Sequence, residues 1–529
     1  MMPPLGNDIL QSMRARAARP TMRKSAALAA AFFCFAFMAG RTIILGTGGE
    51  RRLRRAPEMT ASAMRADITD RNGLLLAKNV YSETLKLNAR IVKRPDELAL
   101  LVHSVFPDIA AADILNKIKT RGGDITLREN ITKDQAAAIR AKPLDGLVIE
   151  NTQRRFYPKK FAAAHIVGFV GKEGRGLEGM ELYANNELLD GQSVRLAADS
   201  RVQSIMWDEL SKAMAAHNAD AAMGAIMNAR TGEIVAMVSL PDFDPDHIAD
   251  YPASNRRNRM MADSFELGSV FKIFNTALAL SSGIPADKSY NIVEPIIHNG
   301  KRIPMGEARG FNPPAKNLSV KQIMQYSCNV GSAKMALDLP AGAQLSFFKE
   351  LGFDRPMATD FGRTARRSFP RGDNPTDRTR WAIGHGISIT PMQLLVAANA
   401  AANGGLLVYP TIYPRDFVPQ SSRIVRPDVS KTIRDILFST KETTGREAAK
   451  NIQGVNYGGK TSTAQKLMPD GTYSPTKNLA AFFATWPIEA PKYSMLVILD
   501  NPKTYPRTAA YSAAPAATRI MDAAIPMLQ

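Results

Sequence analysis

The segment ELGSVFKIFNTALAL, residues 266–280, contains the most informative short motif of this chain, Ser269-Val270-Phe271-Lys272. Ser269 and Lys272 stand three residues apart at the start of an apolar run, which places both side chains on one face of a predicted helix. Because Ser269 opens the run, the pattern predicts that it caps the helix N-terminus. The same position suits a nucleophile, since the backbone N–H groups of a helix N-terminus stabilise developing negative charge.

Two further motifs follow in order, Ser327-Cys328-Asn329 and Lys460-Thr461-Ser462. Each is weak alone, because Ser and Asn are common at helix ends and turns. A lysine acts as a base only when neutral, and its ordinary pKa of about 10.4 makes that form cost about 4.6 kcal/mol at pH 7. Burial and a neighbouring cation lower this pKa. A site in which Lys272 and Lys460 lie together beside Ser269 would therefore contain a lysine able to act as a base. The three motifs predict such an acyl-transfer site, in which the second motif relays protons.

The third motif also fits a different pattern. GVNYGGKT, residues 454–461, matches the G-x-x-x-x-G-K-[ST] pattern of phosphate-binding loops. Such a loop must open a helix, but Pro469, Asp470-Gly471 and Pro475 follow closely and break helices. The sequence therefore disfavours an ATPase.

Composition sets the broad class. The chain has 529 residues, enough for two or more domains, and its hydrophobic content of 45% and charged content of 22% are ordinary. Its net charge of +19 predicts anionic surroundings such as lipid head groups, cell-wall carboxylates or nucleic acid. The absence of zinc-finger and RNA-recognition signatures argues against nucleic acid.

Cysteine and histidine usage argues against a metal site. Two cysteines cannot form a Cys₄ zinc site, and the six histidines show no HExxH spacing, so we expect no metal and no cofactor. Cys34 lies in an apolar N-terminal stretch and Cys328 lies inside the second motif. We therefore expect no disulfide between them.

The N-terminal apolar stretch SAALAAAFFCFAFMAG, residues 25–40, predicts a membrane segment. Its sixteen residues span about 24 Å, short of a hydrocarbon core of about 30 Å. Extending the run to Gly46 completes the span if Arg41 reaches the interface. Phe37 and Met38 spoil the small-residue pattern of a cleavage site, which favours an uncleaved anchor over a signal peptide.

Basic residues flank this anchor, residues 25–46, on both sides. The tail 1–24 is basic and is expected in the cytoplasm, by the preference of basic residues for that side. Basic residues also follow the anchor, so charge alone barely decides the orientation. The basic residues that precede the span are Arg14, Arg16, Arg19, Arg23 and Lys24.

After the anchor the sequence mixes strand and helix signals. RADITDRNGLLLAKN, residues 65–79, has Asn72-Gly73 as a turn between two strand-like runs. Helical patterns follow at 98–105 and 108–119. The glycines of 168–191 are expected in turns.

The C-terminal part changes in texture. Residues 221–245 read as a β-hairpin, and helical patterns dominate from 270 to about 404. Compact apolar strands follow at 480–486 and 493–500, and a helix is expected at 515–525. Strands, then helices, then strands predict an α+β fold and not an alternating βαβ fold.

With these residues in hand, the chain resembles the class B penicillin-binding proteins, specifically the FtsI-type division transpeptidases, whose signature includes the three motifs. Five more segments carry the resemblance: RADITDRNGLLLA (65–77), RRFYP (154–158), GLEGMELYANNELLDG (176–191), RNRMMADSFELGSVFK (257–272) and GHGISITPMQLL (384–395). The resemblance implies a single transmembrane helix, a β-rich, dimerisation-like pedestal domain and a serine transpeptidase domain with an antiparallel five-stranded sheet and a helical cluster. The expected divisions are 1–24 (cytoplasmic tail), 25–46 (anchor), 47–218 (pedestal) and 219–529 (transpeptidase).

The resemblance also implies residue roles. Ser269 would attack the carbonyl of the penultimate D-alanine of a stem peptide, and the N–H groups of Ser269 and Thr463 would form the oxyanion hole. The implied catalytic residues are Ser269, Lys272 as base, and Ser327 with Lys460 as proton shuttle. The implied substrate-binding residues are Asn329, Thr461, Ser462 and Thr463, of which the two threonines would bind the substrate carboxylate.

Three positions depart from the family pattern. Leu267 stands where proline is usual, and His385 stands where tyrosine is usual. Ser462 replaces the glycine of the third motif, where glycine allows close backbone approach. A side chain there narrows the substrate site, changes β-lactam affinity, or points away without effect, and the sequence leaves these three outcomes open.

The alternative functions are a β-lactamase, a division scaffold and an elongation enzyme. No E-x-x-L-N motif lies between Ser327 and Lys460, which argues against a β-lactamase. A catalytically impaired division scaffold and an elongation-type transpeptidase stay open. The implied partners are stem peptides ending in D-Ala-D-Ala, β-lactams, an FtsW-type glycan polymerase and other division proteins. The implied location is the bacterial inner membrane, single-pass, with the catalytic domain periplasmic at the septum.

Overall fold

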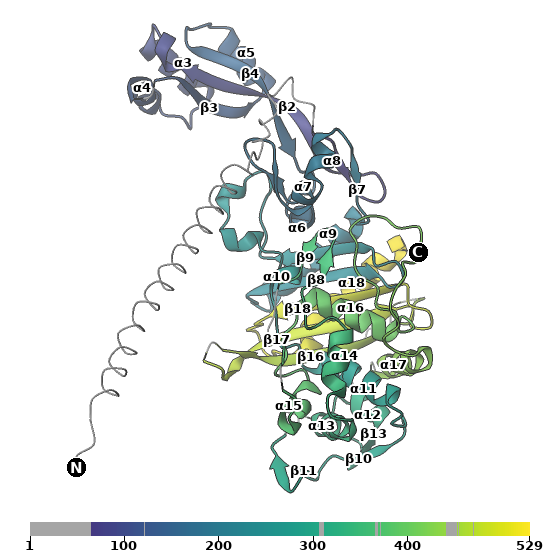
Figure 1. The fold of residues 1–529 in the computed structure, drawn as a ribbon. Coiled ribbons are helices and arrows are strands. Elements are labelled where there is room, and N and C mark those ends of the chain that lie inside the picture. The colour runs from purple at the N-terminus through teal and green to yellow at the C-terminus, as the bar shows by residue number, and fades with distance from the viewer. Residues whose placement is uncertain are drawn as a thin grey trace, which may run out of the picture. The chain divides into compact units, whose positions relative to one another are not determined.

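The computed structural model describes residues 65–528 except 121, 306–310, 366–368, 371, 441–451, 453 and 469. Figure 1 draws their helices and strands. The predicted tail 1–24 and anchor 25–46 lie outside the described residues. Among the helices that are described, none combines the length and the apolar character needed to cross a membrane.

A five-stranded sheet forms the centre of the C-terminal part. All neighbouring strands pair antiparallel, and β16 is an edge strand. The predicted hairpin and the two predicted C-terminal strands are all in this sheet, which confirms the α+β class. The strand order is β16 (Gly458–Leu467), β17 (Tyr473–Trp486), β18 (Tyr493–Asp500), β8 (Ala221–Asn228) and β9 (Ile234–Leu240).

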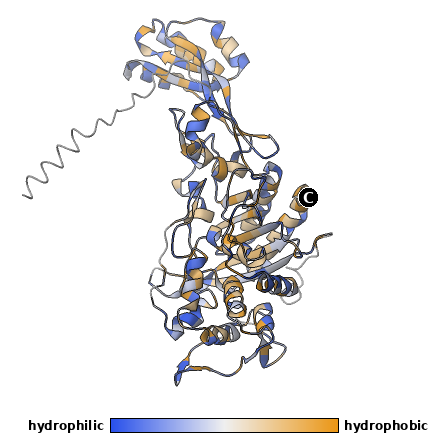
Figure 2. Cartoon of the chain, turned by 45° about the vertical axis from the view of Figure 1, so that its right-hand side comes forward, coloured by the Kyte–Doolittle hydropathy of each residue, from blue (hydrophilic) through white to orange (hydrophobic). Residues whose placement is uncertain are grey.

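Both faces of this sheet are buried, because side chains alternate between them along each strand. On β17, Ala481 and Phe483 pack into one core while Ala480 and Phe482 pack into another. Figure 2 shows the sheet strands as largely hydrophobic. The sequence therefore reads as continuous apolar runs and not as alternating ones.

Helices cover the two faces unequally. Two long helices, α9 (Ser200–Ala216) and α18 (Ala513–Leu528), pack on one face, and α18 confirms the predicted closing helix. A helical cluster packs on the other face and carries the first two motifs. Its members are α10 (Arg259–Ala262), η5 (Gly268–Phe271), α11 (Lys272–Ser281), α12 (Val320–Gln325), α13 (Asn329–Asp338), α14 (Ala343–Glu350), α15 (Pro375–Trp381), α16 (Pro391–Ala402) and α17 (Pro427–Ser439).

Helix α9 lies before the division that we expect between residues 218 and 219. Its apolar side chains Val202, Met206 and Leu210 share one core with the sheet and with α18. By packing, α9 therefore belongs with the sheet. The exact domain boundary stays a prediction.

The pedestal segment, residues 65–198, has its own sheet. In it β2 pairs antiparallel with β3, β4 and β1, and β1 pairs parallel with β7. The strands are β1 (Ile68–Thr69), β2 (Leu75–Asn88), β3 (Asp124–Ile131), β4 (Leu147–Phe156) and β7 (Val194–Arg195). The helices α3 (Pro95–Val105), α4 (Ala111–Thr120) and α5 (Lys133–Arg140) pack on β2 and β3 in a small separate core.

Two local predictions for this segment can be checked. The turn at Asn72-Gly73 is confirmed: Gly73 has φ +82° and the Asp70 carboxylate accepts from the N–H of Asn72 at 2.8 Å. The glycine-rich stretch 168–191 holds more than turns, because it contains the short strands β5 (Phe169–Val170) and β6 (Gly176–Glu178) and the short helices α7 (Gly179–Tyr183) and α8 (Asn185–Leu189). Gly176 is needed for close packing, since a Cβ there would lie 1.7 Å from the Glu181 carbonyl oxygen.

An arginine cluster, Arg65, Arg155 and Glu181, joins three of the family-like segments. Arg65 Nε binds one oxygen of the Glu181 carboxylate at 2.6 Å, and Arg155 Nε binds the other at 2.7 Å. All three side chains are buried. The segments beginning at 65, 154 and 176 therefore meet at one neutralised carboxylate.

Candidate active site

Ser269 lies in a short 3₁₀ turn, η5, that continues directly into α11. The prediction that Ser269 caps the helix is wrong: the cap position is Leu267, and no side chain caps the turn. The turn starts two residues earlier than expected because Gly268, with φ +58°, bends the chain there. The Ser269 hydroxyl is instead available to Lys272, whose Nζ donates to it at 3.1 Å.

Gly268 is held between two other segments. Its N–H donates to the Gly384 carbonyl at 3.3 Å, and a Cβ on Gly384 would lie 2.2 Å from the Gly268 carbonyl oxygen. On the other side, a Cβ on Gly268 would lie 2.7 Å from Ser462 Oγ. Any larger residue at 268 would displace β16 or the 384 loop, so this glycine sets how closely the nucleophile turn approaches the sheet.

Lys272 is the centre of a lysine cluster, Ser269, Lys272, Ser327 and Lys460. Its side chain is fully buried, with an exposed fraction of 0%. Besides Ser269, its Nζ donates to the Ser327 carbonyl at 2.6 Å, the Ser327 hydroxyl at 3.2 Å and Asn329 Oδ1 at 2.7 Å. The first and second motifs are therefore in direct contact.

Ser327 adopts a left-handed backbone conformation, with φ +60°, between α12 and α13. This conformation is uncommon for a residue with a side chain and is found at functional sites. It turns both the carbonyl and the hydroxyl of Ser327 towards Lys272. The next residue, Cys328, is buried, and its Sγ accepts from Gly331 N at 3.2 Å at the start of α13; Cys34 lies outside the described residues.

Lys460 completes the lysine cluster from the edge strand β16. Its side chain is 3% exposed, and its Nζ donates to the Ser327 hydroxyl at 2.9 Å and to the Thr461 carbonyl at 3.1 Å. Burial, and then the positive charge of Lys272, hold the pKa of Lys460 well below its usual range. The Ser327 hydroxyl thus bridges two ammonium groups, one of which is driven towards its neutral form.

Alternation along β16 separates the remaining third-motif residues. Lys460 and Ser462 pair with Phe483 and Ala481, which lie in the core on the helical-cluster face. Thr461 and Thr463 therefore project from the opposite face of the strand. Thr463 Oγ1 accepts from the N–H of Ala509 at 3.0 Å. Both threonines thus lie on the edge strand that carries Lys460, with their side chains on its other face.

Ser462 points into the protein. Its side chain is 2% exposed, and its hydroxyl donates to the carbonyl of Leu267 at 2.5 Å. The side chain therefore faces the nucleophile turn and not solvent, and its effect on β-lactam affinity stays a prediction.

The same strand excludes the phosphate-loop interpretation. Lys460-Thr461 lies inside β16 and not at the start of a helix, whereas a phosphate-binding loop needs the helix N-terminus that follows it. In the part of the chain that the structure describes, no cluster of three or more His, Cys, Asp or Glu side chains is arranged to hold a metal ion.

Sequence reasoning missed a polar group beside the nucleophile turn. The Tyr473 hydroxyl donates to Glu266 at 2.7 Å, and the ring of His385 stacks on Tyr473 with centroids 5.1 Å apart. Burial raises the pKa of Glu266, while burial and the charges of Lys272 and Arg380 lower the pKa of His385. The Gly-His-Gly motif and the closeness of Glu266 to Ser269 were visible in the sequence, but nothing there linked Tyr473 to them.

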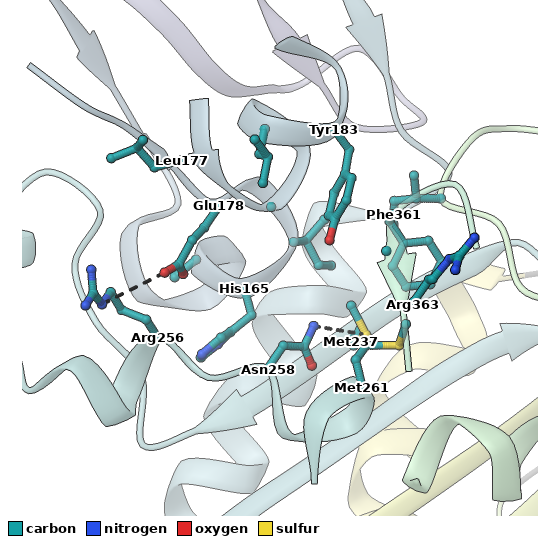
Figure 3. Close-up of a pocket in the computed structure, with 16 residues that line it drawn as sticks. His165, Leu177, Glu178, Tyr183, Met237, Arg256, Asn258, Met261, Phe361 and Arg363 are labelled. Carbon is teal, nitrogen blue, oxygen red and sulfur yellow. Dashed lines mark hydrogen bonds and ion pairs between the residues drawn. The ribbon is translucent and has the colours of Figure 1, made fainter. Parts of the chain in front are cut away.

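A separate cavity of about 180 Å³ lies between the α6–α7 region and β9, α6 being Ala164–Val167 (Figure 3). None of the three motifs lines it. Its carboxylate, Glu178, pairs with Arg256 at 3.9 Å, and burial raises the pKa of Glu178. Burial lowers the pKa of His165 to about 4, and its ring contacts the Asn255 carbonyl at 2.8 Å. Because no serine or lysine of the three motifs lines it, this cavity is separate from the lysine cluster.

Comparisons with known proteins agree with the geometry. Residues 222–522 match the penicillin-binding protein transpeptidase domain, and residues 60–198 match the penicillin-binding protein dimerisation domain. A probable peptidoglycan D,D-transpeptidase FtsI from Caulobacter vibrioides is 30% identical over 523 residues, which cover 94% of this chain and 87% of that protein. The peptidoglycan D,D-transpeptidase FtsI of Escherichia coli is 25% identical, over 86% of this chain and 82% of the relative.

The fold is also found among solved structures. A peptidoglycan synthetase from Bifidobacterium adolescentis superposes with a TM-score of 0.66 at 16% identity, covering 88% of this chain and 96% of that one. At that identity the likeness supports the fold alone. The domain matches, the relatives and the ordered motifs show that the chain belongs to the class B penicillin-binding proteins of FtsI type, which are peptidoglycan D,D-transpeptidases.

Proposed function

We propose that this D,D-transpeptidase cross-links stem peptides at the division septum through an acyl-enzyme on Ser269. The observation that carries the proposal is the contact of two buried lysines through one hydroxyl: Lys272 Nζ lies 3.1 Å from Ser269 Oγ, and Ser327 Oγ bridges Lys272 and Lys460. A serine hydroxyl is a weak nucleophile unless an adjacent base takes its proton. The lysine cluster supplies that base.

The acylation step follows from these contacts. Ser269 Oγ forms a bond to the carbonyl carbon of the penultimate D-alanine while its proton passes to Lys272. The bond to the terminal D-alanine then breaks, and the departing nitrogen takes a proton from the lysine cluster, relayed by the Ser327 hydroxyl that contacts Lys460. Because the pKa of Lys460 is lowered by burial and by Lys272, proton exchange within the cluster is easier than between two ordinary lysines.

Substrate positioning is assigned to the second and third motifs. The Asn329 side chain accepts from Lys272 through Oδ1, which orients its amide so that Nδ2 is the group to donate to a substrate carbonyl. Because β16 is an edge strand, alternate N–H and C=O groups point away from β17 and suit an extended peptide. Thr461 and Thr463 would bind the terminal carboxylate, and the N–H groups of Ser269 and Thr463 would hold the oxyanion.

The second half-reaction closes the cycle. An amine of a neighbouring stem peptide attacks the acyl-enzyme carbonyl, its proton passes to the lysine cluster, and the ester bond to Ser269 breaks as Oγ regains a proton. The product is an amide cross-link.

Labelling with a fluorescent penicillin tests this proposal. The wild-type chain should become covalently labelled, and Ser269→Ala should not. Ser282→Ala, an exposed serine at the other end of α11, is the matched control and should label normally. Absence of labelling in the wild type would contradict the proposal and favour the impaired scaffold.

We also propose the membrane organisation that the sequence implies: a cytoplasmic tail 1–24, an anchor 25–46, a pedestal domain 47–218 and a transpeptidase domain 219–529, with the last two in the periplasm. An FtsW-type glycan polymerase and other division proteins are the proposed partners. Support comes from the FtsI names of the relatives. Depletion separates the alternatives, since undivided filaments mean division and rounded cells mean elongation.

A further inference from the structure

The two unusual residues next to the lysine cluster contact each other. Ser462 of β16 donates its hydroxyl to the carbonyl of Leu267, the residue that precedes Gly268 and Ser269. Leu267 is fully buried and Ser462 is 2% exposed. A buried hydrogen bond of 2.5 Å therefore joins the edge strand to the nucleophile turn.

This bond connects the two backbone segments that the proposed oxyanion hole requires. Ser462 directly precedes Thr463 on β16, and Leu267 lies two residues before Ser269 in the turn. Both segments are short and constrained: β16 is paired along its length with β17, and the turn is held by Gly268 against Gly384. The distance between the N–H groups of Ser269 and Thr463 thus depends on how closely the two segments approach at Ser462.

Close packing supports a specific role for the hydroxyl. A Cβ on Gly268 would lie 2.7 Å from Ser462 Oγ and 3.0 Å from the Cβ of Ala464. The hydroxyl is therefore in contact with the turn, and a bare Cβ at 462 would keep part of that contact without the link to Leu267.

We propose that Ser462 is a positioning residue whose hydroxyl sets the separation of the two oxyanion-hole donors. The inference rests on the proposed function of Ser269. Oxyanion donors act only when they lie within about 2.7–3.1 Å of the developing charge, and misplacement by about 0.5 Å weakens a site markedly. By holding Leu267, Ser462 keeps the nucleophile turn from drifting away from Thr463.

The proposed role predicts which kinetic step responds. Ser462 touches neither the substrate nor the lysine amines, so its loss should slow acylation at saturating penicillin and leave the dissociation constant of the first complex unchanged. The pH dependence of acylation should also keep its midpoint. A change confined to general stability would not slow acylation at saturating penicillin while leaving both the dissociation constant and the pH midpoint unchanged.

Three substitutions distinguish the effect of the Ser462 hydroxyl from the effect of side-chain volume. Ser462→Ala keeps the Cβ and loses the hydroxyl, Ser462→Gly loses both, and Ser462→Thr keeps the hydroxyl. The rate of acylation by the fluorescent penicillin should fall about tenfold in the first two and stay within about threefold of wild type in the third. Ser494→Ala is the matched control, because Ser494 is also a buried serine of this sheet and donates to Asn399; its acylation rate should be unchanged.

Each outcome decides something. A wild-type rate in Ser462→Ala, with a loss only in Ser462→Gly, would overturn the inference, because bulk would then suffice. A shifted pH midpoint in Ser462→Ala would overturn it too, since the effect would pass through the lysines. If wild type is labelled and all three variants match it, the inference alone fails. If wild type is not labelled at all, the proposed function fails and the inference falls with it.

Discussion

The pedestal segment and the lysine cluster give their buried basic side chains different partners. In the arginine cluster, Arg65 and Arg155 each bind one oxygen of the Glu181 carboxylate. In the lysine cluster, Lys272 and Lys460 donate to hydroxyl, amide and carbonyl oxygens and meet across the Ser327 hydroxyl. The first arrangement pairs its two cations with one shared carboxylate, and the second places two amines close together without a carboxylate among their named partners.

The difference has a thermodynamic meaning. A buried ion with a bound counter-ion keeps its charge, whereas a buried amine beside another cation is pushed towards its neutral form. Only the second effect produces a base at neutral pH. The lysine cluster is therefore expected to reduce stability in exchange for reactivity, and the arginine cluster is expected to hold three distant chain segments together.

The largest expected effect comes from breaking the arginine cluster. Glu181→Gln keeps the size of the side chain and leaves two buried guanidinium groups without a carboxylate, which should lower the free energy of unfolding by about 3–5 kcal/mol. Hydrogen exchange should show the loss in β4 and α7, where Arg155 and Glu181 lie. Glu187→Gln, on the exposed side of α8, is the control and should change little. A variant as stable as wild type would mean that the arginines are solvated and not held by this carboxylate.

Sequence patterns predicted the individual helices and strands better than the contacts between them. The spacing of Ser269 and Lys272 follows from helix geometry alone, and the runs of β17 and β18 are long and apolar. The contacts of Ser327 with Lys272 and with Lys460 join residues far apart in the chain, so only the ordered set of motifs anticipated them. Nothing local signals such pairing, because it depends on how the sheet and the helical cluster pack.

The errors have particular physical causes. The capping prediction for Ser269 failed because Gly268 takes a left-handed conformation and starts the turn earlier. The direction of Ser462 was open because a shift of one residue in strand register exchanges the two faces. The left-handed conformation of Ser327 was also hidden, since serine carries no sequence signal for it.

A middle-sized effect of opposite sign is expected in the lysine cluster. Lys460→Met removes one buried amine and should raise the free energy of unfolding by about 1–4 kcal/mol at neutral pH while abolishing acylation. The folded pKa of Lys460 is lowered, so the unfolded chain binds more protons and wild-type stability rises with pH. The advantage of the variant should therefore shrink as pH rises towards about 10.4, the usual lysine pKa.

Urea unfolding at several pH values between about 6 and 9 measures this difference, within the window below the usual lysine pKa. Lys466→Met is the matched control on the same strand, because Lys466 forms an ion pair with Asp500 at 2.6 Å. Its loss should bring no gain in stability. A Lys460→Met protein that is less stable than wild type at neutral pH would contradict the contrast between the two clusters.

The smallest expected effect concerns the backbone that brings the lysines together. Residue 327 has φ +60°, a backbone conformation that glycine adopts with less strain than alanine. Ser327→Gly should therefore be about 1 kcal/mol more stable than Ser327→Ala. Both variants lose the bridging hydroxyl and should acylate slowly to the same degree. Ser439, in the last turn of α17, gives the control with reversed sign, because glycine there should be less stable than alanine by up to about 1 kcal/mol. Equal stability of the two Ser327 variants would show that the left-handed conformation carries no strain. The backbone would then place the hydroxyl between the lysines without any loss of folding stability.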